Sequence, residues 1–151
     1  MPGLEEPNVE ADQAHIDAML NDVPAYHRFH PIAGALRERP TEFDIPNRIA
    51  RATFEIGTEF TNFTGSVQGG IVASMLDEAM GLAAGAYIPS EMSFGATLET
   101  KITFLARAAP GQLLGEGRVL KVSKNIVFLS GQLFGADGRL CAVSSSTATI
   151  R

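Results

Sequence analysis

One segment constrains the fold more than any other: residues 62–81, where a loop of turn-forming residues leads into a long apolar run. The pair Gly69-Gly70 separates the two parts, and the apolar run continues to about residue 86. This order predicts a loop followed by a long helix. At 100° per residue, most of the helix circumference is apolar, and the small and polar residues fall in one narrow stripe. The stripe comprises Gly70, Ser74, Asp77, Glu78 and Gly81.

Two carboxylates lie on this stripe, and they are the first candidates for a functional site. A helix that is apolar on most sides is a buried one, and a carboxylate near it is costly unless it is paired or has a chemical task. We therefore favour Asp77 as a functional residue, whereas the plainer interpretation of Glu78 is a solvated neighbour of Asp77. Ser74 has no base near it in the sequence, so we do not expect a nucleophilic serine.

The segment before the first predicted strand is expected to hold little regular structure. Residues 1–10 lack periodicity and predict a frayed tail, and residues 11–20 fit a short helix. Pro24 and Pro31 predict an irregular connection over residues 23–32. Its histidines are interpreted as surface residues, and its aromatic side chains as packing the connection onto the core.

The rest of the chain shows the alternation of β-strands. After a turn at Pro40 and Pro46, residues 48–56 predict a first strand, and the long helix then ends near Pro89. Further strands are separated by short turns, which implies antiparallel neighbours. These strands are expected over residues 93–106, 113–122, 126–134 and 140–150.

A strand, a long buried helix and an antiparallel meander predict an α+β fold, in which a curled antiparallel sheet wraps around the helix. We divide the chain into residues 1–40, with the tail, short helix and irregular connection, and residues 41–151, with the sheet and the long helix. The strand over 126–134 is apolar on both faces. A second subunit is the simplest cover for its outer face.

Composition narrows the possible functions. The chain has 151 residues and a net charge of −5, which fits a single domain and gives no support for nucleic-acid binding. A lone cysteine, Cys141, excludes an internal disulfide and a cysteine cluster for zinc, and suits a cytoplasmic protein. No secretory signal or membrane span is predicted, because the longest apolar run is interrupted by Asp77 and Glu78.

The spacing of the motif residues resembles that of the hotdog-fold acyl-CoA thioesterases of the PaaI-like group. That group has an Asn, then a Gly, then His-Gly-Gly, and then an Asp on the helix eight residues after the first of the paired glycines. Asn62, Gly69, Gly70 and Asp77 fit this spacing, and Gln68 stands where the family usually has His. The resemblance extends from about residue 48 to the end and includes the segments 96–104 and 110–112.

The resemblance implies a catalytic site at the interface of a dimer, which often pairs into a tetramer. It makes Asp77 the general base or nucleophile, and it gives the Gly69 N–H the task of polarising the thioester carbonyl. Asn62 would position water or the carboxylate, with a turn former or helix cap as its structural alternative. Thr97 would help hold the attacking water from the facing subunit. The implied substrate is an acyl-CoA, so CoA is part of the substrate and no cofactor or metal is expected.

The same chemistry follows in part from the residues themselves. A thioester needs an activated water and a donor for the developing oxyanion; a carboxylate can supply the first and a helix N-terminus the second. Asp77 lies about 12 Å along the helix axis from Gly69, which is too far for one chain's pair to hold one carbonyl. The arithmetic therefore predicts a site shared by two subunits.

Gln68 leaves two functions open. Its amide can donate a hydrogen bond but cannot titrate, so activity without a histidine-like pH dependence is one outcome. The other is a non-catalytic hotdog protein that binds acyl-CoA or another acyl thioester. A dehydratase acting on enoyl-CoA ranks last, because no histidine lies in the motif.

Two further sets of residues are assigned to the substrate. The turn with Lys121, Lys124 and Asn125 is a weak candidate for the CoA phosphates, since each residue alone fits a plain surface position. The acyl tunnel depends on side chains that meet across two subunits, and the sequence leaves its length and the acyl preference open. Candidate tunnel residues are Phe60, Phe63, Met80, Met92 and Phe94.

Overall fold

The computed structural model of the chain describes residues 11–88 and 92–151. The tail predicted over residues 1–10 lies outside these residues, and the long helix ends at Tyr87, close to the end predicted near Pro89. The described chain contains four α-helices, a short 3-10 helix and six strands: α1 (Gln13–Asn21), α2 (Val23–Phe29), α3 (Pro31–Ala35), β1 (Arg39–Asp44), β2 (Ile49–Ile56), η1 (Thr58–Phe60), α4 (Gly69–Tyr87), β3 (Phe94–Phe104), β4 (Gly111–Val122), β5 (Ile126–Phe134) and β6 (Leu140–Ile150).

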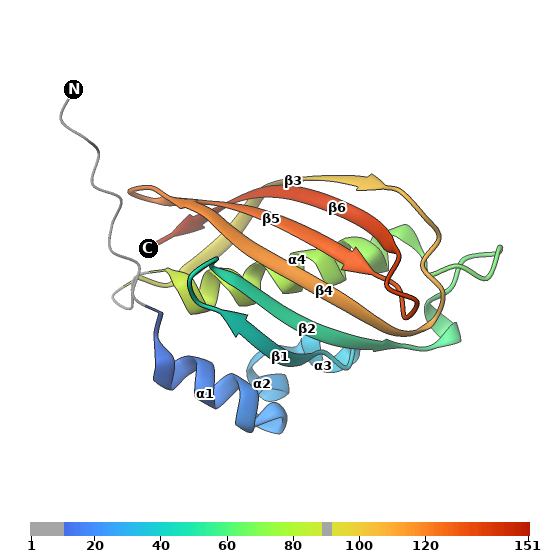
Figure 1. Cartoon of the computed structure of the whole chain (residues 1–151), viewed down its shortest axis with the longest axis horizontal. Helices are drawn as coiled ribbons and strands as arrows, with labels where there is room; N and C mark the ends of the chain where they lie inside the picture. The colour runs from blue at the N-terminus through green and yellow to red at the C-terminus, as the bar shows by residue number, and fades with distance from the viewer. Residues whose placement is uncertain (1–10, 89–91) are drawn as a thin grey trace.

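The strands form one antiparallel sheet in the order β1-β2-β4-β5-β6-β3. The sheet curves around α4, and the short helices α1, α2 and α3 lie together beside the end of the sheet that carries β1 (Figure 1). This is the architecture predicted from the sequence, a curled antiparallel sheet wrapped around a long central helix.

Local sequence explains where α4 begins and what it buries. Gln68 is the N-cap residue: its backbone is extended, and its side-chain oxygen accepts the Gly70 N–H. Met75 and Leu76 on the covered face are fully buried. Each such side chain contributes about 2 kcal/mol when its apolar surface leaves water. The opposite face is the predicted stripe of small and polar residues, and it stays outside this core.

The sheet approaches α4 so closely that some sheet positions have no room for a side chain. A Cβ added to Gly117 on β4 would lie 1.9 Å from the carbonyl oxygen of Ala79, and one added to Gly115 would lie 2.7 Å from the ring of Phe54. Real Cβ atoms do not reach such distances, so these glycines set how deeply the helix sits in the sheet.

The irregular connection predicted over residues 23–32 is wrong, because this segment forms α2 and α3. Pro24 and Pro31 lie in the first turn of these helices, where a missing N–H costs nothing. Asp22 caps α2 by accepting the Ala25 N–H at 3.0 Å. The short helix predicted over residues 11–20 is confirmed as α1.

The sheet contains a strand that the sequence analysis missed. β1 pairs with β2 over residues where Pro40 and Pro46 predicted only a turn. As an edge strand, β1 needs few of its N–H groups for pairing and so accepts Pro40. The domain boundary drawn at residue 41 falls inside β1, and the strand predicted over 48–56 is β2, the second in the chain.

The strand predicted over residues 93–106 is β3, but its neighbour differs from the expected one. The turn at Pro110-Gly111 does not form a hairpin between β3 and β4: β3 pairs with β6 and β4 pairs with β2. The chain therefore crosses from one edge of the sheet to its other half (Figure 1). β3 becomes a sheet edge, and most of its residues are exposed.

Candidate active site

Asp77 lies in the middle of the open face of α4, and β3 runs beside it. Its carboxylate is exposed in the single chain, and its Oδ1 accepts a hydrogen bond from Thr97 Oγ1 at 3.0 Å. The sequence analysis assigned Thr97 to the facing subunit, whereas the structure places it against Asp77 of the same chain. Within one chain, Thr97 and Asp77 therefore form a single unit, and the action of Thr97 across subunits remains a prediction. Ser74, one turn earlier, donates to the Gly70 carbonyl at 3.0 Å.

The N-terminus of α4 presents one free backbone donor. Because the Gly70 N–H donates to the side chain of Gln68, the amide oxygen of Gln68 must face Gly70, and its NH₂ group points elsewhere. The Gly69 N–H has no acceptor among residues 11–88 and 92–151. A Cβ added to Gly69 would lie 3.5 Å from the ring of Phe104, which therefore borders this donor.

Asn62 organises the loop that enters α4. Its Oδ1 accepts hydrogen bonds from the Thr64 N–H at 2.9 Å and the Thr64 hydroxyl at 2.7 Å, and from the Ser66 N–H at 3.3 Å. This is a turn built around one side chain, the structural alternative considered for Asn62. In the single chain its carboxamide oxygen is thus committed to its own loop.

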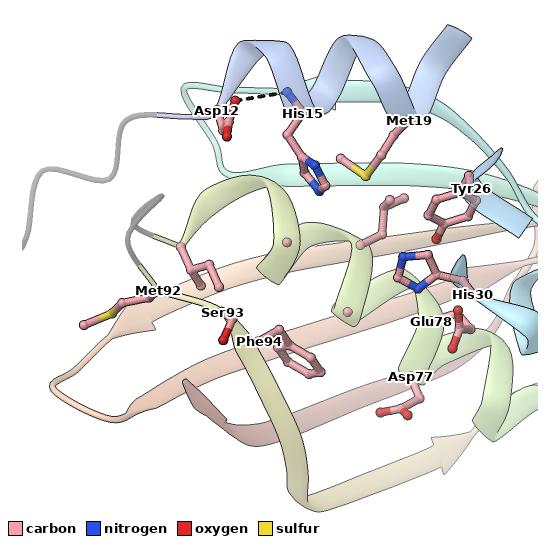
Figure 2. Close-up of a pocket in the computed structure, with 14 residues that line it drawn as sticks. Asp12, His15, Met19, Tyr26, His30, Asp77, Glu78, Met92, Ser93 and Phe94 are labelled. Carbon is pink, nitrogen blue, oxygen red and sulfur yellow. Dashed lines mark hydrogen bonds between the residues drawn. The ribbon is translucent and has the colours of Figure 1, made fainter. Parts of the chain in front are cut away.

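Two hollows meet at Asp77. One is a cavity of about 420 Å³ between the N-terminal helices and α4, and the other is a groove of about 410 Å³ between α4 and β3, which Thr97 also lines. In the cavity, His30 lies beside Glu78, His15 lies next to Asp12 toward the other end, and Ser93 and Phe94 close the side of β3 (Figure 2). A ligand in either hollow can reach the Asp77 carboxylate.

Only some of the predicted tunnel residues line the cavity. Met92 and Phe94 line the cavity. Met80 is buried in the core, where its sulfur accepts the Ser144 hydroxyl at 3.5 Å, and Phe63 is fully exposed at the tip of the loop before α4. Neither Met80 nor Phe63 contributes to the cavity in the single chain.

A buried carboxyl pair lies next to Asp77, and the sequence analysis missed it. Glu38 is fully buried, and its Oε2 accepts the Tyr26 hydroxyl at 3.2 Å. Burial, and then the charge of Glu78, raise the pKa of Glu38 to about 8. The two carboxyl groups interact directly, and this interaction raises the pKa of Glu38 while it lowers that of Glu78. With a pKa of about 8, Glu38 is protonated at neutral pH.

Glu78 is thus more than the solvated neighbour that its sequence position indicated. It is half-buried, and burial is the main cause that raises its pKa, with the charge of Asp77 adding to it; the hydrogen bond from Glu38 opposes the shift. The only signal of this pair in the sequence is the carboxylate stripe, because Glu38 lies in a segment without periodicity. The Oε1 atom of Glu38 has no hydrogen-bond partner among the described residues.

Aromatic residues of the N-terminal helices complete the wall. The rings of Tyr26 and His30 stack with centroids 4.6 Å apart, and His27 donates its Nε2–H to the Glu38 carbonyl at 2.6 Å. Burial, and then the charge of His15, lower the pKa of His30. His27, which was interpreted as a surface residue, is half-buried and fixes Glu38, whereas His30 is exposed as interpreted and borders the cavity.

The turn assigned to the CoA phosphates joins β4 and β5. The Asn125 carbonyl accepts the Ile150 N–H at 3.0 Å, and Lys121 and Lys124 form no ion pair within the described part of the chain. Their role in binding CoA remains a prediction.

Other site classes find no support in the described residues. No group of three His, Cys, Asp or Glu side chains among residues 11–88 and 92–151 is arranged to hold a metal ion. None of the helices in the described ranges is both long and apolar enough to cross a membrane.

Sequence comparison connects this geometry to known proteins. The family model of the thioesterase superfamily matches residues 64–142, just over half of the chain. A candidate esterase of Saccharolobus solfataricus is 35% identical over 94 residues, which span 61% of this chain and 66% of that protein, slightly less than two thirds of its length.

Solved structures share the fold. A candidate thioesterase of Ralstonia eutropha, a phenylacetic acid degradation-related protein, is 28% identical, with a TM-score of 0.76 over 89% of this chain and 98% of that one. The PaaI protein of Escherichia coli, from the phenylacetic acid degradation operon, is 18% identical, with a TM-score of 0.74 over 88% of this chain and 93% of that one. The chain therefore belongs to the thioesterase superfamily, and the resemblance to hotdog-fold PaaI-like thioesterases, predicted from the spacing of its motif residues, is confirmed.

Proposed function

We propose that the protein is an acyl-CoA thioesterase that hydrolyses its substrate to a free acid and CoA, with Asp77 as general base or nucleophile. Membership of the thioesterase superfamily supports thioester hydrolysis as the general reaction. The observation that carries the proposal is the position of Asp77: an exposed carboxylate held by Thr97 where two hollows meet. A fixed carboxylate that remains open to solvent is suited to activate water or to attack a carbonyl itself.

The reaction also needs a donor for the oxyanion that develops on the thioester carbonyl. The Gly69 N–H is suited to this role, because it has no acceptor among the described residues and lies at the positive end of the helix dipole. The NH₂ group of Gln68 is a second donor beside it. Little acid catalysis is needed at sulfur, since a thiolate leaves readily, so the absence of the usual His at residue 68 does not remove an essential step.

The two halves of this site are about 12 Å apart along α4 within one chain. We propose that a second copy of the chain brings its Gly69 to the Asp77 of the first. The exposed edge of β3 supports this arrangement, since unpaired sheet edges commonly bind another strand. Leu98 and Phe104 on that strand are 58% and 56% exposed, although large apolar side chains are normally covered. In such a dimer, we propose that the side-chain amide of Gln68 also acts across the two copies. The same holds for the turn with Lys121, Lys124 and Asn125, which we assign to the CoA phosphates.

Gln68 supports a second candidate function, a protein that binds acyl thioesters without hydrolysing them. Its side-chain oxygen caps α4, and no titratable group replaces the missing histidine at this position. A site of this kind would retain the hollows and the Gly69 donor but would not release CoA.

Thiol release from short, medium, long and aromatic acyl-CoAs separates the two functions. We expect the wild type to release CoA and the Asp77→Asn variant, which keeps the shape but loses the base, to be slower by about a hundredfold or more. Asp137→Asn is the matched control, because Asp137 is an exposed aspartate in the β5–β6 turn. Full activity of Asp77→Asn would exclude Asp77 as the catalytic group, and acyl-CoA binding without release by the wild type would favour the binding protein.

A further inference from the structure

The cavity between the N-terminal helices and α4 has a continuous floor that starts at Asp77. Its floor is the stripe of α4 that follows Asp77, where Gly81 and Gly85 carry no side chains. A Cβ added to Gly81 would meet no atom within 4 Å, and one added to Gly85 would lie 3.8 Å from His15 Nε2. The two glycines therefore leave a channel along the helix, from Asp77 to the imidazole of His15.

The channel has a definite length. Asp77 and Gly85 are eight residues apart, which is about 12 Å along the helix axis. An extended chain advances about 3.5 Å for every three backbone bonds, so about ten bonds cover this distance. An acyl group whose carbonyl lies at Asp77 thus reaches His15 with about eight to ten carbon atoms. The walls beside it include the apolar side chains of Leu82, Ile88 and Phe94, which suit a methylene chain.

The far end of the channel is polar but holds no fixed cation. Asp12 and His15 lie there, and Asp12 is tied to the start of α1 by accepting the His15 N–H at 3.0 Å (Figure 2). No Lys or Arg occurs among the described residues that line the cavity, and the segments 1–10 and 89–91 contain none in their sequence. His30 adds no positive charge at neutral pH, because burial and the charge of His15 lower its pKa. Apart from the two histidines, the ionisable groups are the carboxyl groups of Asp12 and Asp77 and the Glu38–Glu78 pair, so negative charge predominates.

We propose that this cavity is the acyl subsite, and that it selects medium-length acyl groups with an uncharged far end and rejects acyl groups that end in a carboxylate. The proposal rests on the thioesterase function proposed above and names its substrate class. A second carboxylate at the far end of the substrate would face Asp12 without a counter-charge and would lose its hydration. A methyl end packs on the apolar walls, and a hydroxyl end can bond to Asp12 or to the imidazole of His15.

Three substrates of equal length test the end-group selection: decanoyl-CoA, ω-hydroxydecanoyl-CoA and decanedioyl-CoA. We expect kcat/KM for decanedioyl-CoA to be lower than for the other two by about tenfold or more, as expected for a like charge at a few ångströms in a partly covered site. Raising the salt concentration should narrow the difference. Equal kcat/KM values for the three substrates would overturn the proposal.

A variant that blocks the channel tests whether the acyl group lies in it. Gly81→Leu fills the open space one turn beyond Asp77 and also improves the helix propensity, so the fold should be retained. We expect the ratio of kcat/KM for decanoyl-CoA to that for butyryl-CoA to fall by about tenfold or more, with a smaller fall for Gly81→Ala. Ala14→Leu, at an exposed position of α1 that does not line the cavity, is the matched control and should leave the ratio unchanged. An unchanged ratio in Gly81→Leu would contradict the proposal.

A gain of function tests the charge at the far end. His15→Lys places an ammonium group opposite Gly85 on an exposed face of α1, which tolerates lysine well. The preference for decanoyl-CoA over decanedioyl-CoA should shrink by about tenfold. A preference equal to that of the wild type would show that the far end of the acyl group lies elsewhere.

The subsite and the proposed function can fail separately. Release of CoA from butyryl-CoA that depends on Asp77, without the expected end-group selection, would retain the thioesterase and exclude the subsite. If the wild type hydrolyses no acyl-CoA, calorimetry with decanoyl-CoA and decanedioyl-CoA tests the cavity alone. Tighter binding of decanoyl-CoA that is lost in Gly81→Leu would support the subsite, and equal binding of the two would exclude it.

Discussion

Among the single residues, Glu38 has the greatest effect on how the protein responds to pH. It is a fully buried acid that holds a proton at neutral pH next to Glu78, and its Oε2 accepts the hydroxyl of Tyr26. The pair joins the N-terminal helices to α4 directly beside Asp77. Because Glu38 is protonated, it holds the cavity wall together without adding a third negative charge to those of Asp77 and Glu78.

Stability should therefore fall as the pH rises. Burial, followed by the charge of Glu78, raises the pKa of Glu38 from an ordinary value of 4.5 to about 8. Between these values the folded chain keeps a proton that the unfolded chain has released, so the free energy of unfolding decreases by up to about 1.4 kcal/mol per pH unit. The contribution is fully present below pH 4.5 and lost above about pH 8. Urea unfolding at a series of pH values from about 4 to about 8.5, which is about half a unit beyond each of the two pKa values, measures this dependence.

Glu38→Gln serves as the diagnostic variant for this dependence. Glutamine keeps the shape, accepts from Tyr26 and donates to Glu78, but it does not titrate, so the decline with pH should be clearly smaller. Glu55→Gln on β2, an exposed glutamate, is the matched control. A decline of the same slope in Glu38→Gln would assign the pH dependence to other groups.

Sequence reasoning could place residues whose position follows from local spacing. Asp77 and Gly69 were placed on the long helix because helix periodicity and the loop-to-helix transition are local signals, and their roles remain predictions. Thr97 was found through the resemblance, but its contact with Asp77 depends on how β3 lies beside α4. Glu38 could not be found, since nothing in a segment without periodicity shows that a glutamate is fully buried against a partner on a distant helix.

At the scale of secondary-structure elements, the fit of α4 into the sheet depends on glycines of β4. Gly117→Ala would force its Cβ against the backbone of Ala79, which cannot move without shifting the helix. We expect the free energy of unfolding to fall by about 2 kcal/mol or more, as overpacking against backbone does. Urea unfolding measures the change.

A glycine on the opposite face of α4 provides the contrast. Gly81→Ala meets open space and replaces a helical glycine, so stability should rise by up to about 1 kcal/mol. Equal effects of the Gly117 and Gly81 substitutions would show that close packing does not hold α4 in place.

The elements themselves were predictable where their pattern is local and continuous. α4, β5 and β6 were predicted nearly to their ends, because long apolar or alternating runs mark them. α2 and α3 were missed because proline was interpreted as a breaker, although the first helical turn accepts it. The pairing of β3 with β6 could not be read from the sequence, since the length of a connection does not show which strand becomes the neighbour.

At the scale of the whole molecule, one chain contains the parts of the proposed thioesterase site but keeps them apart. Asp77 and the Gly69 N–H lie at different turns of the same helix, and β3 is an exposed edge with uncovered apolar side chains. Two copies related by a two-fold axis would each complete the other, giving two equivalent sites per dimer. The curled sheet and the helix were predictable because the periodicity of apolar residues along one chain indicates them. The pairing of two copies depends on the shape of folded surfaces, which no local sequence pattern describes.

The measurement that tests this account most directly uses hybrid dimers of two inactive variants. Asp77→Asn removes the base, and Gly69→Pro removes only the N–H, because proline is accepted at the first helical position and Gln68 already has the extended backbone that precedes proline. Each variant alone should be nearly inactive. The two proteins, carrying different tags, are coexpressed and the hybrid is isolated.

A hybrid dimer contains one site with both wild-type groups and one site with neither. We therefore expect the hybrid to release CoA from its best acyl-CoA substrate at about half the wild-type rate per dimer. A hybrid as inactive as its parents would contradict the account, because it would mean that Asp77 and Gly69 do not meet across two copies of the chain.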